Sequence, residues 1–107
     1  MATAPKSEVL HLADMANYQD GSVVSRQITK TAAGNITLFA FDQDQELSEH
    51  TAPFDALAHI LDGSAEIKIS GKAFHLETGD AIIMPANEPH ALKATSPFKM
   101  LLTMIRS

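Results

Sequence analysis

The chain has 107 residues, no cysteine and a formal net charge of −5, with 45% hydrophobic and 20% charged residues. This length allows one domain with a core of its own, and the absence of cysteine excludes disulfides, thiolate chemistry and cysteine-ligated zinc. The negative charge and the scattered lysines and arginines argue against a nucleic-acid or membrane partner, and without a signal peptide or a membrane-spanning run a cytoplasmic location is expected.

Residues 1–21 are predicted to form an N-terminal segment, with a short edge strand around 9–12, a helical turn at 13–18 and a break at Asp20-Gly21. Residues 22–107 are predicted to form a single β domain, because short apolar or alternating runs are separated by turn residues at the spacing typical of all-β proteins. The predicted strands are 22–30, 36–41, 46–51, 56–61, 64–70, 73–77, 81–84, 90–94 and 98–105.

Side-chain alternation assigns the faces of these strands, since successive side chains of a strand point to opposite sides of the sheet. Ala65, Ile67 and Ile69 are expected to point inward. The runs 36–41 and 98–105 are apolar on both faces, which predicts that their outer faces are covered too. So many short strands in a small domain predict a sandwich or a closed barrel, which leaves few exposed edges.

The stretch 79–90 organises the rest of the domain. An apolar strand is followed by Pro85 and Pro89, which bracket a short loop that ends at His90. Proline has a fixed φ and no N–H to donate, so both prolines belong at strand ends or bends. The loop is therefore expected to hold His90 at the start of strand 90–94, and the segment 50–63 is its expected partner.

The stretch 79–90 resembles the second motif of the cupin family, which runs Gly, five residues, Pro-x-Gly, two residues, His, three residues, Asn. Gly79, Pro85 and His90 match this motif, while Asn87 stands at its second glycine and Ala94 at its asparagine. The resemblance implies an all-β fold: a double-stranded β-helix or jelly-roll barrel of two packed antiparallel sheets.

The segment 50–63 resembles the family's first motif less completely. His50 matches its first histidine and Gly63 its closing glycine, but Ala52 replaces the second histidine and Ala56 replaces the glutamate. The resemblance implies that His50 and His90 point into one end of the barrel. In the family these positions ligate one divalent metal, usually iron, manganese, nickel or zinc.

Only His50 and His90 remain at the four ligand positions that the resemblance implies. Three protein ligands are the usual minimum for a catalytic metal, so a reduced or absent metal site is expected. The two alanines leave space and remove charge, which suits a small, partly apolar ligand held by a few hydrogen bonds. A barrel filled by its own side chains and water, with the histidines bonded to each other, is the alternative.

The candidate pocket residues are His50 and His90, Ser48 on the expected same face as His50, Ala52 and Ala56 at the vacated ligand positions, and Met84 before the loop. Two further histidines are assigned to the outside. Parity places His59 opposite to Ala56, and His75 lies between inward-facing Phe74 and Leu76.

The sequence therefore predicts a cupin-like barrel that binds a small molecule, with catalysis left open. A metal-dependent enzyme of the dioxygenase or sugar isomerase type is the first alternative, and a structural or sensory module acting as a dimer is the second. A homodimer is expected in any case, because the outer faces of 36–41 and 98–105 would form a large apolar patch.

Overall fold

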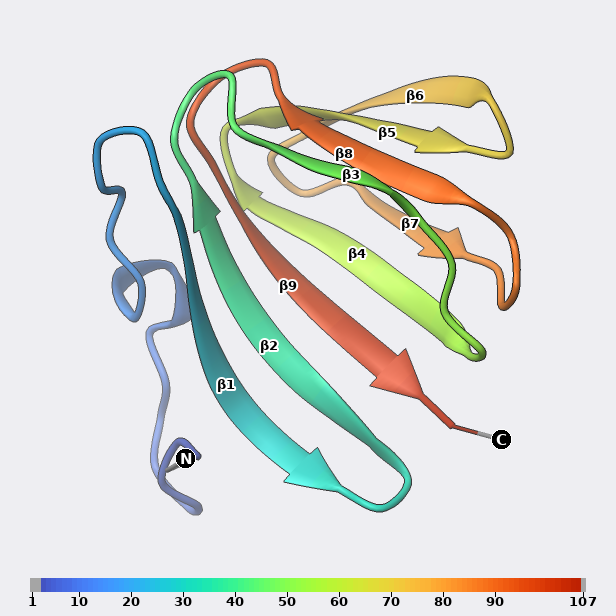
Figure 1. Cartoon of the computed structure of the whole chain (residues 1–107). Coiled ribbons are helices and arrows are strands. Elements are labelled where there is room, and N and C mark those ends of the chain that lie inside the picture. Colours follow the sequence, from blue (N-terminus) through green and yellow to red (C-terminus); the bar gives the residue numbers. More distant parts are fainter. Residues whose placement is uncertain (1–2, 107) are drawn as a thin grey trace.

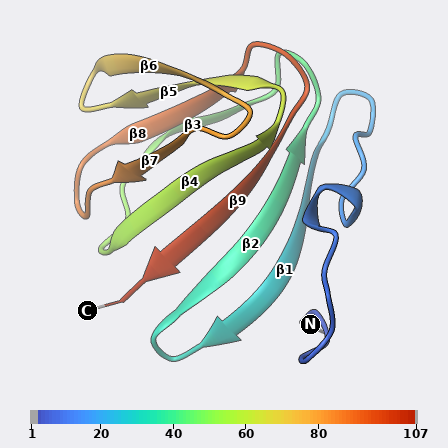
Figure 2. The same ribbon diagram turned by 180° about the vertical axis from the view of Figure 1, so that it is seen from behind.

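The computed structural model describes residues 3–106, which form two facing antiparallel sheets (Figures 1 and 2). No helix in this part of the chain is long and apolar enough to cross a membrane. The elements are η1 (Leu12–Asp14), β1 (Val23–Thr31), β2 (Gly34–Phe41), β3 (Glu46–His50), β4 (Asp55–Asp62), β5 (Ser64–Ile69), β6 (Lys72–Glu77), β7 (Ala81–Met84), β8 (His90–Ala94) and β9 (Phe98–Ile105).

One sheet has five strands in the order β1-β2-β9-β4-β7, and the other has four in the order β3-β8-β5-β6. The all-β class and the two packed antiparallel sheets are confirmed, and every strand predicted within residues 22–107 is present with ends that differ by at most two residues. Strand spacing was predictable because Gly63, Gly71 and Gly79 all adopt positive φ values, the conformation that ends a strand in a tight turn.

The core lies between the two sheets and is tightest where β2, β9 and β5 pass one another. Phe41 and Phe98 stack with ring centroids 4.5 Å apart, and neither side chain is exposed. Ile60, Ile67 and Met100 are also fully buried there. The inward assignment for β5 is confirmed, because Ala65 and Ile67 belong to this core and Ile69 packs against it.

The N-terminal segment departs from the prediction, since residues 9–12 form no strand. Only a single 3-10 turn at Leu12–Asp14 is present, and the segment runs beside β1 on the outside of the five-stranded sheet (Figures 1 and 2). Ala4 N–H donates to the Ile28 carbonyl at 2.8 Å, a single contact rather than a ladder. The apolar residues of the segment contact the sheet face instead of pairing along its edge.

This segment, residues 4–18, buries one half of the outer face that the sequence left bare. Leu38 and Ala40 on β2 have no exposed surface, and they pack with Leu10, Leu12 and Met15. The segment is fastened at its end by Tyr18, whose hydroxyl donates to Asp62 at 2.5 Å, and by Lys99, which donates to the Ala13 carbonyl. The apolar patch behind the expected dimer is therefore smaller than the sequence suggested.

Candidate functional site

The loop between β7 and β8 is fixed by backbone hydrogen bonds to the start of β4. The Ala86 N–H donates to the Asp55 carboxylate at 2.8 Å, and the Asn87 N–H donates to the Ala52 carbonyl at 2.7 Å. Bonds of this kind satisfy the polar groups that a turn leaves unpaired. The position of His90 is thus set by the loop that precedes it.

Asn87 adopts a left-handed conformation with φ of 64°. Glycine has no steric penalty in this region, and asparagine tolerates it better than most other residues. The asparagine at the family's glycine position therefore preserves the turn. On the other side of the loop, the Ser70 N–H donates to the Pro89 carbonyl at 2.8 Å, which ties the residue before His90 to the β5–β6 turn.

A bulge in β3 brings His50 onto the same face as His90, although the His50 side chain stays exposed. The pairing of β3 with β8 matches Leu47 with Leu92 and His50 with His90, so two residues of β3 lie opposite one residue of β8. Leu92 and His90 are both buried on the inner face of β8. Leu47 and His50 consequently share that inner face even though three positions separate them.

The expectation that Ser48 shares the face of His50 is wrong, because strict alternation fails at this bulge. Ser48 and Glu49 both lie opposite Ala91, which is on the outer side of β8. Ser48 still contributes to the site through its backbone, since its carbonyl accepts a hydrogen bond from the Nδ1–H of His50 at 2.7 Å.

The two imidazoles meet edge to face across the strand pair. Their Nε2 atoms are 3.1 Å apart, the ring centroids are 4.3 Å apart and the ring planes are inclined by 71°. Nδ1 of His90 lies 3.2 Å from the Glu88 carbonyl, which repeats the contact of His50 with the Ser48 carbonyl. Each ring is thereby oriented by a backbone oxygen two residues before it.

These contacts fix the protons of the pair. A carbonyl oxygen can only accept, so Nδ1 must carry the proton in both His50 and His90. Both Nε2 atoms then present lone pairs to each other at 3.1 Å. Two lone pairs at this distance repel, so one additional proton, shared as N–H···N, or a cation bound by both nitrogens would stabilise the arrangement.

A second additional proton is disfavoured. Burial lowers the pKa of His90, the positive charge of His50 lowers it further, and only the hydrogen bond to the Glu88 carbonyl acts in the opposite direction. Desolvation and like charge both penalise the imidazolium form. The pair therefore accommodates one shared proton more readily than two.

The surroundings of the pair are apolar on the side of the five-stranded sheet. β3 ends and β4 begins at this end of the barrel, as β7 ends and β8 begins there. Ala56 and Met84 face each other across β4 and β7, and each is only 2% exposed. Met104 pairs with Ala56 from β9 and packs against the same core.

The donor set fits a metal only in part. Two nitrogens that share one metal at about 2.0–2.1 Å lie roughly 2.9–3.4 Å apart, and the Nε2 separation of 3.1 Å falls in that range. Ala52 and Ala56, however, offer no donor atom in their side chains. Among residues 3–106, no group of three or more His, Cys, Asp or Glu side chains could hold a metal ion.

Polar residues on the inner face of β1 and β2 were missed in the sequence. Thr37 and Asn35 have the same parity as Phe39, which packs against the barrel core, and Gln27 pairs with Thr37. Asn35 is also paired with Met104, which is itself paired with Ala56. Asn35 and Thr37 stand four and two residues before Phe39 in β2, so they lie on the same inner face, near the N-terminal end of that strand. The alternation of side chains from Phe39 would have revealed them.

His59 and His75 lie outside the barrel. Ala56, Ala58 and Ile60 are buried, so His59 points outward as parity predicted. His75 is exposed on β6, where its Nε2 is 3.6 Å from Glu77. Neither ring approaches the histidine pair.

Comparisons with known proteins agree with this architecture. A family model described as a cupin domain matches residues 37–105. A conserved protein of unknown function from Streptococcus pyogenes is 34% identical, with a TM-score of 0.92 over 100% of this chain and 96% of that one. A cupin superfamily protein from Desulfitobacterium hafniense is 27% identical, with a TM-score of 0.91 over 99% and 97% of the two chains.

A cupin 2 conserved barrel domain protein from Leptotrichia buccalis is 36% identical, with a TM-score of 0.88 over 91% of this chain. The matched part is 47% of that longer protein. No curated protein matches the chain.

Proposed function

The chain belongs to the cupin family, and on that premise we propose that it binds a small, partly apolar molecule inside the barrel, where His50 and His90 meet. The contact between the two Nε2 atoms carries this proposal. It gives the ligand one polar anchor, because the charge of a shared proton can pair with a ligand oxygen even though every ring nitrogen already has a partner. The alanines and methionines beside the pair supply the apolar wall.

The preference for a small molecule over a tightly bound metal follows from the donor count. Ala52 and Ala56 stand where two further ligands would be needed, and a site with two imidazoles holds a metal weakly. Small apolar side chains at these two positions suit contact with the carbon skeleton of a ligand better than they suit metal ligation. Polar groups on β1 and β2, such as Thr37, add hydrogen-bond partners on the opposite wall.

A metal-dependent enzyme is the second candidate, and the Nε2 separation of 3.1 Å favours it. His50 and His90 would hold the metal through these nitrogens, and the other coordination positions would be left to water or substrate. A metal in such a site supplies Lewis acidity toward a substrate oxygen. The dioxygenase and sugar isomerase types remain the expected classes for this alternative.

Analysis of protein purified without a histidine tag separates the two candidates. We expect a small organic molecule that is released on denaturation and is detected by mass spectrometry, together with substoichiometric metal. His90→Ala should lose the molecule, whereas the exposed control His75→Ala should keep it. Stoichiometric iron, manganese, nickel or zinc that depends on His90 would instead support the enzyme.

We also propose that two copies associate through the outer face of β4, β7 and β9, which residues 4–18 leave open. Leu57, Ile83 and Ile105 are 38%, 60% and 63% exposed there, and they line a groove of about 430 Å³. An apolar patch of this kind supports self-association through a two-fold axis. This dimer would also serve a structural or sensory role, the third candidate.

Light scattering at micromolar concentration tests the dimer. The native chain should have a dimer mass, and Ile83→Glu should convert it to a monomer by placing a charge in the interface. Val9→Glu is the matched control, because Val9 is 85% exposed on the N-terminal segment. A native monomer, or equal effects of the two variants, would rule out this face.

A further inference from the structure

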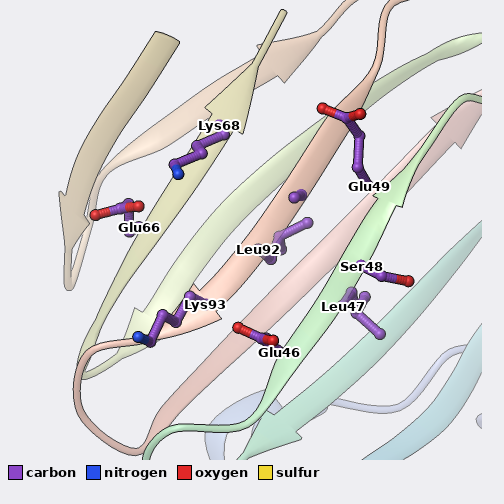
Figure 3. Close-up of a pocket in the computed structure, with 9 residues that line it drawn as sticks. Glu46, Leu47, Ser48, Glu49, Glu66, Lys68, Leu92 and Lys93 are labelled. Atoms are coloured by element: carbon purple, nitrogen blue, oxygen red, sulfur yellow. The ribbon is translucent and has the colours of Figure 1, made fainter. Parts of the chain in front are cut away.

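A second hollow lies on the outer surface of the four-stranded sheet, across β3, β8 and β5 (Figure 3). Its volume is about 230 Å³, and we call it the outer groove. Figure 3 shows Glu46 and Glu49 on the β3 side and Lys68 and Lys93 on the β5 and β8 side. The groove is separated from the histidine pair by the thickness of the sheet.

The sequence explains why the sheet is hollow here. Ala91 stands in the middle of the groove and fills little space, while its neighbour Lys68 on β5 carries a long side chain. On the other side, the β3 bulge directs both Ser48 and Glu49 to this face, where a regular strand would direct one residue. Ala91 therefore forms the floor of the groove, and the longer side chains on β3 and β5 rise on either side of it.

The lining of the groove carries both charges: Glu46 and Glu49 lie on β3, Lys93 lies on the central strand β8, and Lys68 lies with Glu66 on β5. Strand pairing aligns Glu46 with Lys93 and Lys93 with Glu66 across the three strands. Opposite charges on neighbouring strands often form ion pairs. Within residues 3–106, however, none of the charged side chains of the groove forms one. These charged groups are therefore available to a ligand.

We propose that the outer groove binds a small zwitterion of the free amino acid class. The ammonium group would lie toward Glu46 and Glu49, and the carboxylate toward Lys68 and Lys93. Charge complementarity selects this class, because a simple anion would also meet the glutamates and a simple cation would also meet the lysines. Ser48 also lines the groove on the β3 side.

The proposal is independent of the barrel site, because no side chain of the histidine pair faces the groove. Binding can therefore be followed by amide NMR shifts, with L-glutamine as the zwitterion and acetate and methylammonium as its two charged halves. We expect saturable shifts centred on Ser48, Lys68 and Ala91 with L-glutamine. Each half should bind at least about tenfold more weakly, a difference of about 1.4 kcal/mol.

Two variants test the location. Ala91→Leu fills the floor from the exposed side and should weaken L-glutamine binding at least about tenfold, while the amide spectrum stays dispersed. Lys68→Gln keeps the shape and should also weaken it, whereas Lys72→Gln, on β6 outside the groove, should not. The proposal is overturned if L-glutamine produces no saturable shifts, if they centre on His90, if either half binds as tightly, or if Lys68→Gln has no effect.

Discussion

The two ends of the barrel interior use the same strands for different purposes. At one end, Phe41 and Phe98 stack and are fully buried, so that the sheets are held apart by tightly packed rings. At the other end, the buried side chain of Ala56 is small, and the Nε2 atoms of His50 and His90 face each other. The difference predicts that the aromatic end contributes more to stability than the histidine end, where we propose that the ligand binds.

Removing an aromatic ring should have the largest effect on stability. Phe98→Ala is expected to lower the free energy of unfolding by about 3–5 kcal/mol, because it deletes a buried ring and leaves a cavity. His50→Ala, at the exposed rim of the other end, should cost less than about 1 kcal/mol. Urea denaturation measures both, and equal losses would contradict the division of the interior into two functional ends.

Restoring the missing donors should transform the histidine end into a metal site. Ala52→His with Ala56→Glu is expected to raise zinc affinity by at least about tenfold over the native chain, because two ligands join His50 and His90. Zinc titration by calorimetry is the measurement. The triple variant that also carries His90→Ala should lose most of the gain; an unchanged affinity in the double variant would mean that positions 52 and 56 do not face His90.

The stability of the turn before His90 should depend on which residue occupies the left-handed position of Asn87. Asn87→Ala is expected to cost about 1 kcal/mol, because its φ of 64° is unfavourable for a residue with a Cβ and no local hydrogen-bonding side chain. Asn87→Gly should be close to neutral. Thermal unfolding of the two variants provides the comparison, and a more costly glycine would show that the asparagine side chain has a separate role.

The pH dependence of stability should show the smallest effect. The pKa of His90 is lowered by burial and by His50, so the unfolded chain binds more protons than the folded chain below the ordinary histidine value of 6.5. The free energy of unfolding should therefore be complete above that pH and decrease as the pH falls through the lowered pKa. His90→Gln should flatten this slope in urea titrations between those values. A slope that His90→Gln leaves unchanged would assign the effect to other groups.

Most of the fold could be predicted because its information is local. Alternation in β5, paired apolar faces in β9 and glycine turns such as Gly63 are visible in short windows of sequence. The path of residues 4–18 was not predictable, since their contacts with Leu38 and Ala40 are distant in sequence. A run of apolar residues does not reveal whether it pairs along an edge or covers a face.

The sequence predicted only those features of the site that depend on the positions of the two motifs. The proximity of His50 and His90 followed from the spacing of the two motifs, but the direction of Ser48 did not. A bulge inserts one residue without a sequence signal as clear as glycine or proline, and it reverses the parity of every residue before it. The backbone carbonyls of Ser48 and Glu88, which set the proton positions, carry no side-chain signature at all.

The protonation of the histidine pair tests the central claim most directly. Long-range proton–nitrogen NMR of the imidazole rings, at a pH just below the ordinary histidine pKa of 6.5, should show Nδ1 protonated in both His50 and His90. One proton should be shared between their Nε2 atoms, and adding zinc should displace it. Two independent Nε2–H tautomers, with no coupling between the rings, would contradict the account of this end of the barrel as a binding site built on the pair.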